Sequence, residues 1–229
     1  SSVMMDAFII FLLVCIFLYS LCGGKIPWQR ANNKLLYISL VWMIYVFFEL
    51  FNPSAVIEAW VYTRNSFYNF TLLVLLTSLL LSRVLDIKRI LFLLSIFTLI
   101  AIAKALIQRY IGFDAGENAW LIRSESYKTH LLPSGIRYFS IFSDAGNFGS
   151  NMGMAAVVFM ILSFYMSNKK LRYYYRFVSL LAAYGLIMSG TRGAMIVPLG
   201  GLAMFILLNK NIRYIVGGAI CLLFIYIFF

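Results

Sequence analysis

Long apolar runs separated by short polar stretches make up most of the chain. Runs such as LLVLLTSLLL and ILFLLSIFTLIAIA are apolar on every side, without the period-two alternation that strands of a membrane β-barrel would show. Their lengths approach the roughly 20 residues that a helix needs to cross a bilayer. The pattern therefore predicts an all-α, polytopic transmembrane helical bundle. About eight membrane segments are expected, at residues 3–21, 35–51, 67–81, 90–107, 148–166, 177–189, 194–208 and 214–229.

Basic residues fall in alternate connections between these segments. The first, third, fifth and seventh connections hold twelve basic residues and a single acid, Asp86. Cytoplasmic loops carry an excess of lysine and arginine, so these four connections are expected on the cytoplasmic side. The other connections, among them a long loop at about 108–147, are then on the outer face. We take residues 1–229 as a single transmembrane domain that carries this outer loop.

Composition agrees with a membrane protein and narrows the possible functions. Hydrophobic residues make up 63% of the chain, charged residues make up 12%, and the mean hydropathy is +0.91. The net charge of +11 does not indicate nucleic-acid binding, because most of it lies in the loops expected to face anionic lipid. Cys15, Cys22 and Cys221 lie in or beside apolar runs and predict neither a disulfide nor a metal site.

Three arginines stand at the ends of apolar runs: Arg64 in AWVYTRN, Arg137 in SGIRYFSIF and Arg192 in IMSGTRGAM. Charge at membrane depth is costly and persists where it contacts a partner, so these arginines are candidates for binding an anionic ligand. None of the three lies in the four basic connections, so all three are expected on the outer side. Arg64 has the alternative role of anchoring its helix at the membrane interface.

Arg192 has the most specific local sequence. Residues 189–193, with the sequence SGTRG, join two apolar segments with almost no loop, so the following helix is expected to begin at the arginine itself. Free backbone N–H groups, the positive end of the helix dipole and a guanidinium would then meet at one point, which suits a phosphate. Snorkelling of the arginine to lipid headgroups is the alternative.

The outer loop is the one stretch large enough to hold a small extramembrane structure. Solvated connector residues are expected at Arg123, Glu125 and Lys128. Asp144 and Asn147 are expected to cap the helix that follows, and Gly149 with Gly153 to give that helix a small-residue face for close packing.

The motif SGTRGA at a helix start is preceded by the outer-face segment RYFSIFSDAGNFGSNM and, further back, by ELFNPSA and AWVYTRN. Together these motifs resemble the O-antigen ligase and O-antigen polymerase family of bacterial polysaccharide enzymes. The family's most recognisable element is a serine or threonine followed by arginine and glycine at a helix start, and Thr191, Arg192 and Gly193 fit it. The resemblance extends over most of the chain.

The resemblance implies a membrane glycosyltransferase with a GT-C-like fold and no cofactor or nucleotide-sugar site. Such enzymes take a glycan from undecaprenyl diphosphate on the outer face of the bacterial inner membrane. They pass it to lipid A core, in lipopolysaccharide biosynthesis, or to a growing polysaccharide. The arginines that hold the diphosphate in the family correspond to Arg192 by motif and, less directly, to Arg137, and Arg64 is the third candidate for the same diphosphate site. Ligase and polymerase are not distinguished by these residues.

The base proposed for the family is a histidine in an outer loop that follows the arginine-glycine motif. We expect this chain to be a piece of a longer protein. The piece is expected to end before that loop. His130, the single histidine, precedes the motif, so an ordinary loop residue is favoured over a catalytic one.

Two other classes of protein stay open. A transporter or flippase for an anionic lipid-linked glycan would need much the same basic site, and discontinuous helices or an internal repeat would favour it. Pro53 and Pro198 break the apolar runs, but no repeat is evident at corresponding positions. A non-catalytic membrane scaffold predicts no clustering of the three arginines.

Overall fold

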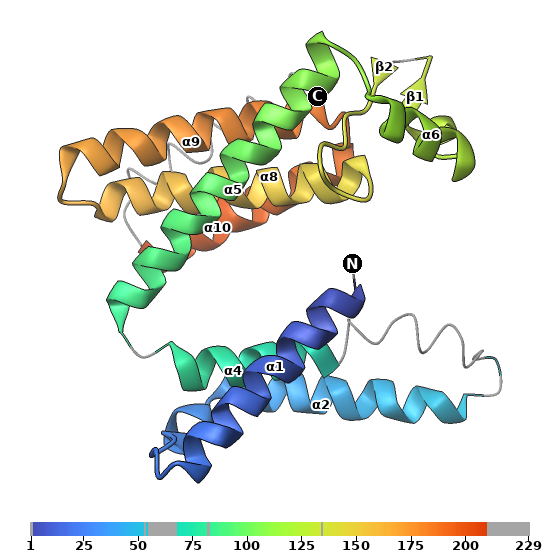
Figure 1. The fold of residues 1–229 in the computed structure, drawn as a ribbon. Coiled ribbons are helices and arrows are strands. Elements are labelled where there is room, and N and C mark those ends of the chain that lie inside the picture. Colours follow the sequence, from blue (N-terminus) through green and yellow to red (C-terminus); the bar gives the residue numbers. More distant parts are fainter. Residues whose placement is uncertain (1, 53, 55–67, 82, 134, 210–229) are drawn as a thin grey trace. The chain divides into compact units, whose positions relative to one another are not determined.

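The computed structural model describes residues 2–52, 54, 68–81, 83–133 and 135–209 (Figure 1). Within these residues the chain is mostly helical, which confirms the expected all-α class. It falls into two compact units, Ser1–Arg89 and Ile90–Phe229, each of which has its own packing.

In the first unit a short apolar helix packs against two others. The elements are α1 (Ser2–Leu21), η1 (Trp28–Ala31), α2 (Lys34–Phe48), η2 (Glu49–Phe51) and α4 (Tyr68–Leu80), and α4 contacts both α1 and α2. Asn33 caps α2 by accepting from the N–H of Leu36 at 2.9 Å. Its amide also donates to the hydroxyl of Ser78 on α4 at 3.0 Å. These contacts satisfy polar groups between helices that otherwise present apolar side chains.

The second unit is built on an antiparallel helical hairpin. Its long helices are α5 (Val84–Tyr110), α8 (Ala145–Tyr165), α9 (Lys169–Met188) and α10 (Ile196–Asn209), and the short η4 (Arg192–Met195) precedes α10. The first residues of α5 belong to the first unit. As expected, Asp144 caps α8, accepting from the N–H of Asn147 at 2.8 Å. At the other end of the hairpin, Arg172 donates from two guanidinium nitrogens to the carbonyl of Met166 and so completes the end of α8.

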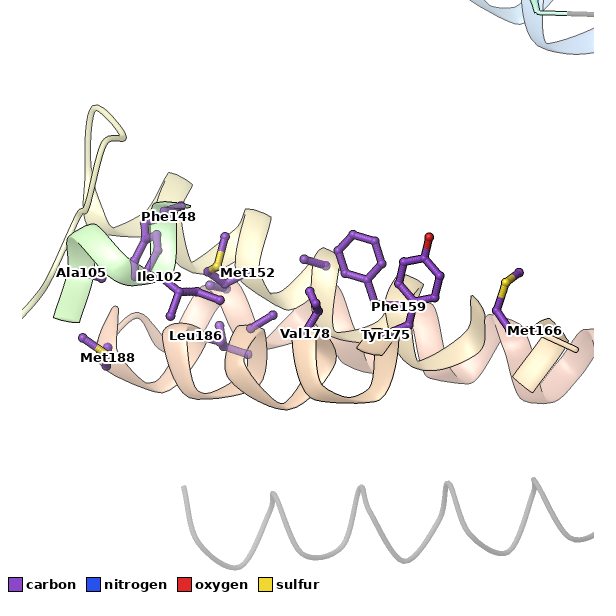
Figure 2. Close-up of a cluster of buried hydrophobic side chains, with 14 residues drawn as sticks. Ile102, Ala105, Phe148, Met152, Phe159, Met166, Tyr175, Val178, Leu186 and Met188 are labelled. Atoms are coloured by element: carbon purple, nitrogen blue, oxygen red, sulfur yellow. The ribbon is translucent and has the colours of Figure 1, made fainter. Parts of the chain in front are cut away.

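The core of this unit lies between α5, α8 and α9 (Figure 2). Phe148, Phe159 and Val178 are almost fully buried, and the rings of Phe159 and Tyr175 stack with centroids 5.8 Å apart. Ser179 of α9 donates to the carbonyl of Ala156 on α8 at 2.6 Å, which satisfies its buried hydroxyl. The hairpin is thus held by interdigitated side chains along its length.

A neighbouring face of α8 carries glycines and allows a much closer approach. A Cβ atom added to Gly149 would lie 2.4 Å from the hydroxyl oxygen of Ser189 and 2.9 Å from the Cβ of Ala194. A Cβ added to Gly153 would lie 2.8 Å from the Cδ of Pro198. The expected small-residue face is therefore confirmed, and its partner is the segment that contains Arg192.

Three described helices are long and apolar enough to cross a membrane: Lys34–Phe51, Val84–Tyr110 and Ala145–Tyr165. Three further apolar helices, Asp6–Leu21, Tyr68–Leu80 and Arg192–Leu208, are shorter. This is fewer than the eight crossings expected. The segment expected at 177–189 is the second half of α9, whose first half carries four basic residues, and the segment at 214–229 lies outside the described residues.

Large apolar side chains are exposed along several helices, among them Phe8, Phe11, Val41 and Phe97. A water-soluble monomer rarely exposes contiguous apolar surface of this extent. The same surface is stable in hydrocarbon, so these helices are suited to contact lipid.

The glycine face predicts a position-specific loss of stability. Gly149→Ala should lower the free energy of unfolding by about 1–3 kcal/mol, because neither the Cβ of Ala194 nor the hydrogen-bonded Ser189 can move aside easily. The measurement is the thermal denaturation midpoint in detergent. Gly200→Ala, with open space around its Cβ, is the matched control and should change little. Equal midpoints for the two variants would contradict the close contact.

Candidate functional site

The outer loop folds into a small structure between α5 and α8. It contains α6 (Ala115–Arg123), α7 (Tyr127–His130), β1 (Leu131–Leu132) and β2 (Gly135–Ile136). The two strands pair antiparallel, with Leu131 opposite Ile136. The expectation that this stretch holds a small structure of its own is confirmed, and its location outside the membrane stays a prediction.

A charged cluster fastens the start of α6 to the last turns of α5. Asp114 and Glu117 form a capping box, in which each carboxylate accepts from the backbone N–H of the other residue. Lys104 of α5 lies 2.8 Å from the Asp114 carboxylate and 2.9 Å from that of Glu117. The hydrogen bond from Lys104, followed by the one from the Glu117 N–H, lowers the pKa of Asp114 below its usual value.

Arg137 begins a short strap, residues 137–140, that follows β2 and connects three elements. Its backbone N–H donates to the carbonyl of His130 at 2.8 Å. The next N–H, of Tyr138, donates to the carbonyl of Met188 at the end of α9 at 3.3 Å. The strap therefore lies directly beside the point where α9 gives way to the SGTRG turn, residues 189–193.

The side chain of Arg137 contacts this turn. Its Cγ lies 3.1 Å from the position that a Cβ on Gly190 would occupy, so the aliphatic stem rests on the glycine. Gly190 has φ of +59°, a left-handed conformation that favours glycine. Any side chain at this position would be strained and would also displace Arg137.

Arg192 opens the helical segment that follows, as expected, although its first turn is of the 3₁₀ type. The turn before it is ordered by Ser189, whose hydroxyl donates to the carbonyl of Leu186 and accepts from the N–H of Thr191. A helix start leaves its first backbone N–H groups without intrahelical acceptors. These groups and the exposed guanidinium are together available to a ligand.

Two of the three candidate arginines therefore meet at the SGTRG turn, one within it and one in contact with it. Arg137 contacts Gly190, two positions before Arg192, whereas Arg64 lies outside the described residues. Within the described part of the chain, the ion pairs involve Lys104 and Lys128, and neither Arg137 nor Arg192 has a carboxylate partner.

His130 is enclosed in the loop and not presented at its surface. The side chain is 3% exposed, and its ring lies edge-on to Trp120 and Phe139, with centroids 5.8 and 5.0 Å apart. Nδ1 lies 2.8 Å from the carbonyl of Ser126. The imidazole is thus shielded from solvent, and its low-ranked catalytic role stays a prediction.

Three charged residues of the loop are at its surface. Arg123 is exposed, and Glu125 forms an exposed ion pair with Lys128 three residues later. Exposed pairs of this kind contribute little to stability. Their arrangement is that of the solvated connector expected from the sequence.

Two residues of α5 at this end of the unit were not singled out by sequence. Gln108 is 2% exposed and binds the strap through its amide. The guanidinium of Arg109 lies over the rings of Tyr110 and Tyr184, at 5.8 and 5.7 Å. An amide or a cation at a helix end has no sequence signature that reveals such partners, because Ser140 and Tyr184 lie far along the chain.

Comparison of the chain with protein-family models, with curated proteins and with solved structures gave no match.

Acid should loosen the start of α6. A carboxylate whose pKa is lowered on folding stabilises the folded state above its unfolded pKa of about 3.9, and that contribution is lost as the pH falls through the lower folded value. Hydrogen exchange should therefore show the protection of residues 115–118 decreasing below about pH 4. Asp114→Asn keeps a good capping residue but loses the ion pair, so its protection should depend less on pH. An unchanged pH dependence in this variant would contradict the assignment.

Proposed function

We propose that this protein is a membrane glycosyltransferase that transfers a glycan from undecaprenyl diphosphate to lipid A core or to a growing polysaccharide. The reaction takes place on the outer face of the bacterial inner membrane, and the protein acts as a multi-pass enzyme of the O-antigen ligase and polymerase type. The observation that carries the proposal is the contact of Arg137 with Gly190, which brings a second arginine to the turn that holds Arg192. The family motif at residues 191–193 supports it.

The chemistry fits a diphosphate leaving group. The acceptor hydroxyl attacks the anomeric carbon of the donor, the bond from that carbon to the diphosphate oxygen breaks, and the hydroxyl proton passes to a base. Negative charge grows on the diphosphate as the bond breaks. Guanidinium groups and helix-start N–H groups that face this charge stabilise the transition state more than the bound donor. We assign the base to none of the described residues.

Arg192 should tolerate neither alanine nor lysine in the complete protein. Lysine keeps the charge but loses the two-pronged hydrogen bonding of the guanidinium, so both Arg192→Lys and Arg192→Ala should be strongly impaired. A loss of about 3 kcal/mol in the transition state corresponds to roughly a hundredfold in rate. The measurement is complementation of glycan assembly in a strain lacking the enzyme, with protein abundance determined alongside.

Arg123→Ala is the matched control, because Arg123 is an exposed arginine of the same outer loop. It should complement fully. Full activity of Arg192→Ala at normal abundance would leave Arg192 as a headgroup anchor and remove the main support for the proposal. Reconstitution then separates transfer from transport: glycan transfer between a donor and an acceptor supplied in the same leaflet supports the enzyme, and movement of the donor without transfer supports a flippase.

The proposed orientation predicts which loops are accessible from outside. In a variant lacking Cys15, Cys22 and Cys221, a cysteine at Ala119 should react in intact cells with an impermeant thiol reagent, and a cysteine at Ser167 should not. Both positions are exposed, and neither side chain holds a helix cap. Permeabilised cells, in which both cysteines should react, are the control. Labelling of position 167 in intact cells would overturn the orientation and the outer-face site.

A further inference from the structure

Gln108 holds the backbone of Ser140 with both ends of its side-chain amide. Its Oε1 accepts from the Ser140 N–H at 2.9 Å, and its Nε2 donates to the Ser140 carbonyl at 3.1 Å. Nε2 also donates to the carboxylate of Glu117 at 2.8 Å. Gln108 and Ser140 are 2% and 3% exposed, so this clamp is shielded from water.

Ser140 needs such support because its backbone is left-handed. Its φ is +57°, a conformation that is unfavourable for a residue with a side chain. The hydroxyl of Ser140 donates to the carbonyl of Ala101 at 2.6 Å, so its backbone and its side chain are all bound to α5. Strained residues of this kind persist where the surroundings fix them, and they are frequent at functional sites.

The clamp lies at the end of the strap that carries Arg137. The start of the strap is fixed by the hydrogen bonds from Arg137 to His130 and from Tyr138 to Met188. At its far end, the backbone of Ser140 is bound by the side chain of Gln108. Among the described residues, no other side chain is hydrogen-bonded to this backbone. Gln108, together with the hydrogen bond from the Ser140 hydroxyl to Ala101, therefore fixes the end of the strap on α5.

We infer that Gln108 is a positioning residue, which holds Arg137 against Gly190 so that its guanidinium meets the diphosphate together with Arg192. This inference rests on the proposed function, because it assigns Arg137 to the anion site. Gln108 itself touches no substrate. Its effect on binding must pass through Arg137, and that requirement makes the inference testable.

The test is a double-mutant cycle on the full-length protein in detergent or nanodiscs, with farnesyl diphosphate as the probe. Gln108→Met removes the amide and keeps the approximate shape, and it should raise the Kd about tenfold. In an Arg137→Ala background the same change should have almost no effect on the Kd, because the group that it positions is absent. A general loss of structure would weaken binding in both backgrounds.

Lys104→Met is the matched control. It loosens the start of α6 through the same cluster but does not contact the strap, so the Kd should stay close to that of the unmodified protein. Should Gln108→Met not accumulate as folded protein, Gln108→Asn takes its place in the cycle, since its amide stays polar but ends one methylene short of Ser140. Thermal denaturation midpoints are measured for every variant.

The possible outcomes separate the two proposals. If Arg137→Ala alone leaves the Kd unchanged, the proposed diphosphate site fails, and the role of Gln108 fails with it. If Arg137→Ala weakens binding while the Gln108 variant has no effect, or has the same effect with and without Arg137, the site stands and the positioning role is overturned.

Discussion

The close contact between α8 and the segment after α9 is the constraint on which the candidate site depends. Gly149 and Gly153 let the backbone of α8 approach Ser189, Ala194 and Pro198 at distances that leave no room for a methyl group. In a bilayer the hydrophobic effect does not drive helices together, so such packing supplies the association. The position of the SGTRG turn, and hence of Arg192, follows from it.

A second set of contacts brings the outer loop to this turn from the other side. The last turns of α5 supply Lys104 to the start of α6 and Gln108 to the strap, while the end of α9 accepts from Tyr138. The contacts of Gln108 are shielded from water, so its amide and the Ser140 backbone would be costly to leave unpaired. The loop is therefore held as part of the second unit, and the contacts of Gln108 and Tyr138 hold the strap that carries Arg137.

The sequence predicted those parts of the fold that depend on local pattern. Apolar runs located the helices, and Asp144 marked the start of α8, because its carboxylate bonds to an N–H three residues away. The span count was less accurate, because the basic residues at 169–176, which the sequence assigned to a connection, form the first half of the same helix as the apolar segment that follows. The spacing of Gly149 and Gly153 indicated close packing, but it did not indicate which segment packs against these glycines.

The candidate site was likewise predicted in part from local sequence pattern. The sequence drew attention to Arg137 and Arg192, and the structure places Arg137 on the glycine two positions before Arg192. It could not indicate Gln108 and Ser140, which are 32 residues apart, or a left-handed serine, since neither feature leaves a local pattern. Contacts between residues that are far apart in the sequence can be identified only from the folded structure.

Arg137 and Arg192 have different surroundings, and the difference bears on whether each is suited to bind a ligand. An arginine that snorkels to lipid headgroups needs a mobile side chain, and Arg192 is exposed at a helix start, which is compatible with this. The stem of Arg137 instead rests on Gly190, and the backbone around it is bound at residues 137, 138 and 140. Fixing a long side chain in one place has an entropic cost that snorkelling does not require, whereas binding a small anion benefits from it. Arg192 has the more specific local sequence, but the restraint on Arg137 is the stronger physical argument for the proposed anion site.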